Sequence, residues 1–265
     1  MFCVRSSAER SETVLHFLNI FPAQSRKTPC KPPTLITQEG IHTMPIVFFN
    51  DPARLQKLIL LMLDSMTVTL KIFLLTLILS IPLGLLISQG RMSKRWYIQK
   101  PVSFYIYIMR GTPLMLQILF IFFAMPYILP VKLDRFYAAI FAFTINYAAY
   151  FAEIFRAGLQ SIPVGQREAG RVLGYTKPQI FFRILLPQVI KRVLPPMTSE
   201  VITLVKDTAL ASIIAVTELL TVAKKQVSGS SSFEPYIIAA ILYLIFNGVA
   251  EQLCKYAERK LDYYQ

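Results

Sequence analysis

The 265-residue chain has few of the side chains on which enzyme sites and metal sites depend. Its histidines and cysteines are limited to His16, His42, Cys3, Cys30 and Cys254. The cysteines have neither the spacing of a zinc or redox motif nor the density of a disulfide framework. The sequence also lacks a GxxxxGK(S/T) phosphate loop and any HExxH or GxSxG arrangement. We therefore expect no bound cofactor, no metal site and no catalytic residue, which means that this chain is not itself an enzyme.

Charged side chains are scarce as well. They make up 16% of the chain, whereas hydrophobic residues make up 54% and include 19 phenylalanines and 13 tyrosines. A water-soluble surface cannot accommodate so many apolar side chains, so the composition predicts an integral membrane protein in contact with lipid. The formal net charge of +13 would suit a nucleic-acid-binding protein. In a membrane protein, however, lysine and arginine accumulate in the cytoplasmic connections, and we expect no nucleic-acid partner.

Long apolar runs indicate where the chain crosses the membrane. Four charge-free runs are close to the roughly 20 residues that a crossing helix needs, and they cover residues 72–90, 111–131, 136–152 and 235–250. A fifth run, residues 194–214, contains Glu200, Lys206 and Asp207. Those charges have to face protein or water rather than lipid. The sequence thus predicts an all-α membrane protein with five transmembrane helices.

Lysine and arginine are distributed unevenly between the two sets of connections. Fourteen lie after the first span, between the third and fourth spans, and after the fifth, whereas six lie in the opposite connections. Cytoplasmic connections carry the excess of positive charge. We therefore expect the N-terminus outside the cell and the C-terminus in the cytoplasm.

The first 43 residues differ in composition from the rest. They mix basic residues with prolines, and their apolar stretch at residues 14–21 is too short to span a membrane. No small-residue cleavage site follows that stretch, which disfavours a signal peptide. Residues 38–40, Gln-Glu-Gly, correspond to purine-rich codons at the distance of a bacterial ribosome-binding site from Met44. We therefore expect translation to start at Met44, so that residues 1–43 are absent or form a disordered extension and residues 44–265 form the transmembrane domain.

A polar and basic stretch, QREAGRVLGYTKPQIFFRILLP at residues 166–187, interrupts the apolar sequence between the third and fourth spans. Its pattern predicts a short helix over residues 166–173 that ends at Gly174, a residue suited to the left-handed conformation. Thr176 can then cap a second helix, and Pro178 is tolerated in the first turn of that helix. We expect these two helices to form a rigid knob at the membrane surface.

The knob resembles the EAA loop of binding-protein-dependent ABC importer permeases. The matching positions are Glu168, Ala169, Gly174, Ile184, Leu186 and Pro187. The resemblance implies a coupling helix, in a loop of about residues 160–190, that docks in a groove of a separate ATPase subunit, which binds ATP and magnesium. It assigns the coupling surface to Gln166, Glu168, Ala169, Gly170 and Gly174. Gly170 stands where the family usually has a second alanine, and we expect it to loosen the helix by about 1 kcal/mol.

From about residue 69 to the C-terminus the chain is similar to the polar-amino-acid branch of these permeases. The similar segments are residues 69–70 with Gly84, 110–114 with Gln117, 146–153, 165–166, 186–188 and 206–208. Ser199 and Ala209 depart from the branch, which usually has Asn and Ser there. The resemblance implies a type I ABC importer permease fold in a bacterial cell membrane. It also implies two permease subunits, identical or not, two ATPase subunits and an extracytoplasmic amino-acid-binding protein.

Polar residues inside the predicted spans are candidates for the substrate path. Asn146, Tyr150 and Glu153 are spaced to share one face of the third span. Glu200, Thr203 and Asp207 repeat this spacing on the fourth span, with Lys206 beside them. Two such stripes could hold a zwitterion by its ammonium and carboxylate groups, and we assign the path to Asn146, Glu153, Thr203, Lys206 and Asp207.

Other readings of these carboxylates remain open. Glu153 could pair with Arg156 at a helix end, and Asp207 could belong to a structural network. A secondary transporter coupled to a proton or sodium ion through Glu153 and Asp207 is the main alternative function. Such a transporter would be expected to show an internal inverted repeat, which the five unequal spans do not display.

Overall fold

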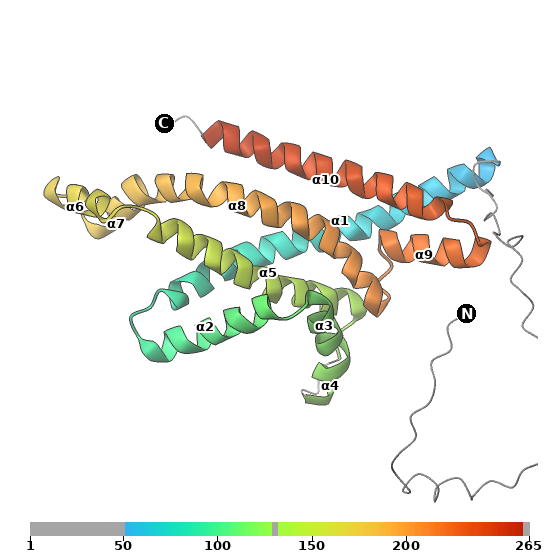
Figure 1. Ribbon diagram of the computed structural model, residues 1–265, viewed down its shortest axis with the longest axis horizontal. Coiled ribbons are helices and arrows are strands. Elements are labelled where there is room, and N and C mark those ends of the chain that lie inside the picture. Colours follow the sequence, from blue (N-terminus) through green and yellow to red (C-terminus); the bar gives the residue numbers. More distant parts are fainter. Residues whose placement is uncertain (1–50, 129–131, 262–265) are drawn as a thin grey trace, which may run out of the picture. The chain divides into compact units, whose positions relative to one another are not determined.

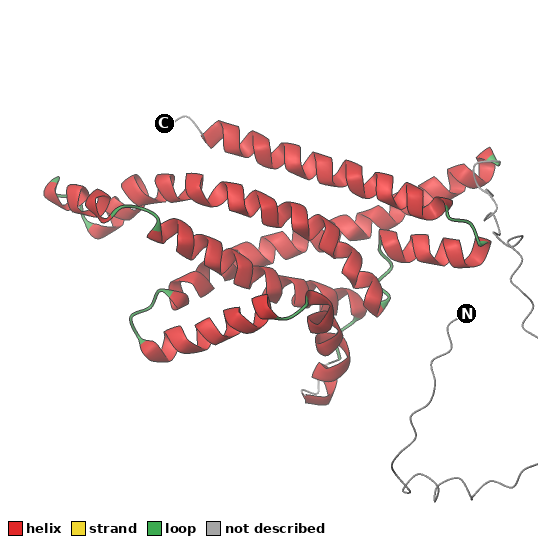
Figure 2. Cartoon of the chain, in the orientation of Figure 1, coloured by secondary structure: helices red, strands yellow, loops and turns green. Residues whose placement is uncertain are grey.

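The computed structural model describes residues 51–128 and 132–261. Every regular element within those residues is a helix, as predicted (Figure 2). The described residues belong to a compact unit formed by residues 44–265. The predictions for residues 1–43, including the start of translation at Met44, lie outside the described residues.

Two long helices, α1 (Pro52–Arg91) and α5 (Arg135–Gln160), pack along each other (Figure 1). The buried stripe of α1 is rich in small residues, namely Ser65, Thr69, Thr76, Ser80, Gly84 and Ser88. A Cβ atom added to Gly84 would lie 2.8 Å from the Cβ of Phe151 on α5. Helices in a membrane gain stability from such close approach, because lipid provides no hydrophobic drive for their association. The small residues therefore allow α1 and α5 to come together.

Three helices, α1, α5 and α10 (Glu234–Leu261), are long and apolar enough to cross a membrane. Within the most apolar 18-residue segment of each helix, 67% of the residues are buried in α5, 28% in α1 and 11% in α10. Helix α5 is therefore central in this unit, whereas α1 and α10 present leucine and isoleucine side chains outward. Such outward apolar faces suit contact with lipid or with another membrane subunit.

The second predicted span is a bent pair of helices. Helix α2 (Trp96–Gly111) is followed by α3 (Leu114–Leu119), a π-helical turn (Phe120–Ala124) and α4 (Met125–Ile128), with a bend of 109°. The predicted run of residues 111–131 contains the second half of this pair, Leu114–Ile128, whereas α2 was not predicted as part of a span. Thr112 is extended and Pro113 has no N–H to donate, so the helix ends where the proline begins. The pair is a broken span or a re-entrant segment.

The fourth predicted span is displaced toward the N-terminus. Helix α8 (Leu186–Asp207) begins eight residues before the predicted start, and the chain changes to a 3₁₀ helix over Thr208–Ile214. Because α8 contains charged residues, it is not one of the helices that are identified as possible membrane spans by length and apolarity alone. The described residues thus contain three such spans, or four with the bent pair, and five spans remain a prediction.

A buried carboxylate fixes the short helix α9 (Leu219–Ser230) against its neighbours. Glu218 is fully buried, and its oxygens accept hydrogen bonds from the backbone N–H groups of Leu220 (2.8 Å) and Thr221 (2.6 Å). The hydroxyl of Tyr243 on α10 donates to it at 2.8 Å. Leu219 and Val222 pack on Leu58 and Met62 of α1. The N-terminal halves of α1 and α10 therefore meet at α9.

Candidate functional site

The predicted knob is present at the C-terminal end of α5. Helix α6 (Val164–Val172) ends at Leu173, and Gly174 follows with a φ of 77°, in the left-handed region. The second helix begins as α7 (Lys177–Gln179) and continues as a π-helical turn, η3 (Ile180–Leu185), into α8. The side-chain oxygen of Gln179 accepts hydrogen bonds from the backbone N–H of Thr176 at 2.8 Å and from its hydroxyl at 2.9 Å. The predictions of a glycine corner and of a threonine at the helix start are confirmed.

The predicted coupling residues divide into an outer and an inner group. Gln166, Glu168 and Ala169 are exposed on α6, where a partner could reach them. Gly170 instead faces inward, and a Cβ atom there would lie 2.9 Å from Cγ1 of Ile180 and 3.0 Å from Cδ1 of Ile184. Gly170 therefore lets η3 pack closely on α6.

Three apolar side chains that are exposed on the knob were not predicted from the sequence as contact residues. Val164, Val172 and Leu173 are 67%, 88% and 70% exposed. Apolar residues exposed beside charges are typical of a surface that another protein covers. In the sequence, the sign of such a contact surface was that these apolar residues lie within an otherwise polar stretch.

A groove of about 480 Å³ lies where α2, α5 and α8 meet. Its charged and aromatic lining consists of Arg110, Tyr150, Glu153, Arg192 and Glu200. The guanidinium carbon of Arg110 lies 5.3 Å from the ring centroid of Tyr150, a cation–π distance. Arg110 and Glu200 both line the groove, but no ion pair joins them in the described part of the chain. The groove thus offers to a ligand the guanidinium groups of Arg110 and Arg192 and the carboxylate of Glu200.

Glu153 has its own partners at the edge of this groove. Its Oε2 accepts from Nη2 of Arg156 at 2.7 Å, and its Oε1 accepts from Nε of Arg91 at 3.3 Å. Arg91 also donates to the hydroxyl of Ser103 on α2. The alternative that Glu153 pairs with Arg156 is therefore confirmed, and the same carboxylate also joins the C-terminal end of α1 to α5.

Asn146 lies beside the bend between α2 and α3 rather than in the groove. It is buried, and its amide donates to the carbonyl of Met109 at 3.1 Å and to the side-chain oxygen of Gln117 at 2.9 Å. The amide of Gln117 in turn donates to the carbonyls of Met109 (3.0 Å) and Thr112 (3.2 Å). Carbonyls freed by a helix break need such partners when they are buried. Asn146 and Gln117 therefore hold the end of α2 from which Arg110 projects.

The remaining predicted path residues, on α8, do not line the groove. The hydroxyl of Thr203 donates to the carbonyl of Ser199 in its own helix at 2.9 Å. Asp207 accepts from the hydroxyl of Tyr147 at 2.7 Å, which fits the structural-network alternative. Lys206 lines a separate cavity of about 300 Å³ with Tyr236 and Tyr243. Of the five predicted path residues only Glu153 lines the groove, together with Tyr150 and Glu200 from the same two stripes.

Residues 80–263 match the family described as binding-protein-dependent transport system inner membrane component. The chain belongs to this family. Membership makes it the membrane component of a transport system that includes a separate binding protein, and it favours an ABC importer over the secondary transporter considered above.

Individual relatives in the family are permease proteins of bacterial transport systems. The octopine transport system permease protein OccM of Rhizobium radiobacter is 35% identical over 212 residues, covering 77% of this chain and 86% of that protein. The arginine permease protein ArtQ of Bacillus subtilis is 34% identical over 200 residues, covering 75% and 91%. The L-cystine permease protein TcyB of B. subtilis is 38% identical over 200 residues, covering 74% and 84%.

Solved structures agree with the type I importer permease fold. The crystal structure of an amino acid ABC transporter with histidines superposes with a TM-score of 0.74 at 33% identity, covering 82% of this chain and all of that chain. An inward-facing structure of the MetNI methionine ABC transporter gives a TM-score of 0.60 at 20% identity, covering 80% and 98%. The second likeness concerns the fold alone.

Proposed function

We propose that this chain imports a polar amino acid, which an extracytoplasmic binding protein delivers and a separate ATPase drives across the membrane. The relatives in the family are named for the transport of octopine, arginine, glutamine and cystine. The observation that carries the proposal is the groove in which Arg110 and Glu200 lie without an ion pair between them. An amino acid zwitterion fits that arrangement because it carries one carboxylate and one ammonium group.

In the proposed site, Arg110 binds the substrate carboxylate and Glu200 binds the ammonium group. A guanidinium is suited to the first task because its planar fork matches a carboxylate. The ring of Tyr150 keeps Arg110 in place, and the groove volume lies within the about 300–1,000 Å³ of small-molecule sites. Glu153, held by two arginines, positions α5 at the edge of the site.

The groove is open, and we propose that a second permease subunit, identical or homologous, closes it. The proposed topology has five crossings: α1, the bent pair α2 to α4, α5, α8 and α10. The N-terminus of α1 and helix α9 then lie outside, whereas α6 and the C-terminus of α10 lie in the cytoplasm. The basic side chains after α1, around α6 and at the end of α10 support this orientation.

The ATPase is proposed to hold α6 through its exposed face. Val164, Val172 and Leu173 supply apolar contact area, and Glu168 supplies a charge-assisted hydrogen bond. A helix as short as α6 is not stable by propensity alone. It is held instead by the turn at Gly174 and by η3, so movement of α6 is passed to α8 through η3.

Uptake by proteoliposomes that contain the complete transporter tests the substrate site. Arg110→Gln and Glu200→Gln are expected to raise the KM for amino acid uptake at least tenfold, because each removes a charge-assisted contact to the substrate. Both variants should still co-purify with the ATPase. Lys206→Gln is the matched control, since Lys206 lies outside the groove. If uptake is normal in the two groove variants and lost in the control, the substrate binds near Lys206 and not in the groove.

A further inference from the structure

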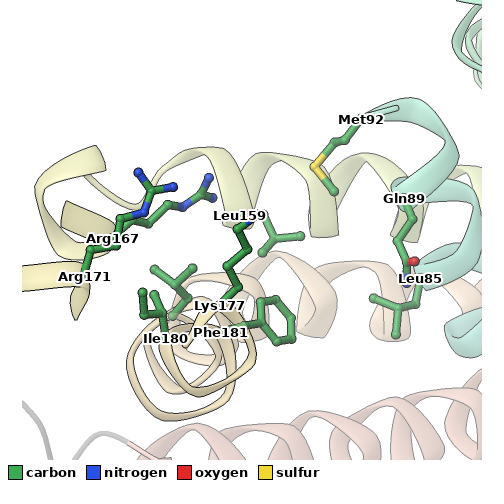
Figure 3. A pocket seen from close by; sticks show the side chains of 10 residues that line it. Leu85, Gln89, Met92, Leu159, Arg167, Arg171, Lys177, Ile180 and Phe181 are labelled. Carbon is green, nitrogen blue, oxygen red and sulfur yellow. The ribbon is translucent and has the colours of Figure 1, made fainter. Parts of the chain in front are cut away.

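A second groove, of about 570 Å³, lies between the C-terminal end of α1, the end of α5 and the knob. Figure 3 shows side chains reaching it from all of these elements. One side of its lining is basic and comprises Arg167, Arg171 and Lys177. The rest is mainly apolar and includes Leu85, Leu159 and Phe181. The groove is therefore amphipathic, with its charge toward the knob and its apolar wall toward the membrane-crossing helices.

The three basic residues have no acidic partner in the described part of the chain. No hydrogen bond or ion pair of their side chains occurs among those residues, whereas Arg91 and Arg156 nearby are both paired with Glu153. Arg167 and Arg171 are four residues apart on α6, so they project from the same face of the helix. Lys177 reaches the groove from α7, beyond the glycine corner. The basic side is thus built from two elements, and no acidic side chain of the described residues pairs with it.

The apolar side continues into surfaces that suit lipid. Leu86, next to Leu85 on α1, is 65% exposed, and Phe182, next to Phe181 on η3, is exposed as well. Leu85 itself is 45% exposed. An acyl chain could therefore enter the groove from the bilayer without crossing a polar barrier. A free phosphate or a nucleotide would use the basic side and leave the apolar wall in water.

We propose that this groove binds one anionic phospholipid, with its phosphate on Arg167, Arg171 and Lys177 and an acyl chain against Leu85, Leu159 and Phe181. A lipid held this way contacts α1, α5, α6 and η3 together. It stabilises the position of the knob relative to the spans, so hydrolysis and uptake are best coupled when anionic lipid is present. The proposal concerns a regulatory site and stands apart from the substrate groove.

Lipid retention by the purified transporter tests the binding. The transporter, in nanodiscs of phosphatidylcholine with one fifth phosphatidylglycerol, is released into detergent, and bound lipid is measured by native mass spectrometry. Each cation near a membrane surface contributes about fivefold to anionic lipid affinity. The triple variant Arg167→Gln, Arg171→Gln, Lys177→Gln should therefore lose bound phosphatidylglycerol by about a hundredfold. The matched control is Lys94→Gln, Arg95→Gln, Arg183→Gln, which removes equal charge outside the groove and should retain the lipid.

A matched pair of tryptophan substitutions tests the apolar side of the groove. Leu85→Trp fills the groove without changing charge and should displace the lipid, whereas Leu86→Trp, one residue along the exposed face of α1, should not. Hydrolysis stimulated by the binding protein should depend on phosphatidylglycerol in the wild type and in both controls, and not in the groove variants. Equal retention of phosphatidylglycerol in all variants would overturn the proposal. So would loss of ATPase co-purification in the triple variant at every lipid composition, because the cations would then serve the ATPase.

Discussion

The side-chain amide of Asn146 on α5 lies 2.9 Å from the side-chain oxygen of Gln117 on α3 and donates a hydrogen bond to it. The two residues come from different helices and share the carbonyl of Met109 as an acceptor. They close the gap that Pro113 leaves in the helical hydrogen bonds, and they do so one residue away from Arg110. Asn146, which the sequence predicts in the substrate path, is instead hydrogen-bonded at the end of α2 that carries Arg110.

Asn146→Leu should weaken both stability and substrate binding. Removing the amide leaves the side-chain oxygen of Gln117 without its donor, while the carbonyl of Met109 keeps only the bond from Gln117, and we expect a cost of about 1–3 kcal/mol. We expect a lower unfolding temperature in detergent and a raised KM for uptake. Thr144→Val on the same helix is the control, because the buried hydroxyl of Thr144 has no hydrogen-bond partner. If both variants unfold like the wild type, Asn146 does not brace the bend.

Gly170→Ala should impair coupling even though alanine favours a helix by about 1 kcal/mol. The added Cβ would meet Ile180 and Ile184 at 2.9 and 3.0 Å, so η3 has to shift away from α6. We expect less hydrolysis for a given amount of bound ATPase. Adding Ile180→Ala should restore part of it, a coupling that a double-mutant cycle measures. Gly248→Ala on α10, where the new Cβ meets nothing within 4 Å, should leave hydrolysis unchanged.

Glu153→Gln should destabilise the C-terminal ends of α1 and α5. Arg91 and Arg156 would each lose a charged partner, and since both arginines are about 30% exposed we expect a cost of about 1–3 kcal/mol. Adding Arg91→Gln should cost less than the sum of the two single changes. Thermal unfolding of the three variants checks this. Strictly additive effects would show that Arg91 and Glu153 do not interact.

Glu218→Gln should loosen α9. The carboxylate oxygens accept from four donors, and an amide nitrogen in place of one oxygen would face the backbone N–H of Leu220 and the hydroxyl of Tyr243. We expect a loss of about 2–3 kcal/mol in unfolding free energy. Glu251→Gln, which breaks an exposed pair with Lys255, should cost less than about 0.5 kcal/mol. Equal effects would mean that the buried network contributes no more than a surface pair.

Local patterns predicted the knob well because its signals are carried by single residues. Gly174 has the left-handed conformation that its position suggested, and Pro178 and Thr176 lie where a helix begins. Apolarity was a poorer guide to the second span, since the run of residues 111–131 located the segment Leu114–Ile128 but not α2 before the bend, which carries Lys100 and Arg110. Pro113 was visible in the sequence, but the two amides that make a break tolerable come from α3 and α5 and are assigned only by tertiary contacts.

The polar stripes predicted on the third and fourth spans also show that helical spacing does not reveal tertiary contacts. Helical spacing correctly placed Tyr150 and Glu153 on one face, and Glu200 meets them in the groove. Spacing could not show that Arg110 completes the set from α2, or that Asp207 is already bonded to Tyr147. Partners that lie 40 to 60 residues apart depend on how the helices pack, which periodicity does not specify.

We propose Glu168 as the residue through which an ATPase moves this subunit. It is exposed on α6 among basic residues, so Glu168→Lys changes the docking charge without disturbing a crossing helix. Glu251→Lys on α10 is the control with the same change of charge.

The deciding measurement is ATP-driven uptake of labelled arginine, glutamine and cystine into proteoliposomes that contain the permease, its ATPase and its binding protein. We predict that the wild type and Glu251→Lys take up at least one of the three with ATP, and that Glu168→Lys keeps its fold while uptake and stimulated hydrolysis fall at least tenfold. Wild-type uptake by Glu168→Lys, or uptake driven by a proton or sodium gradient in the absence of ATP, would contradict the account.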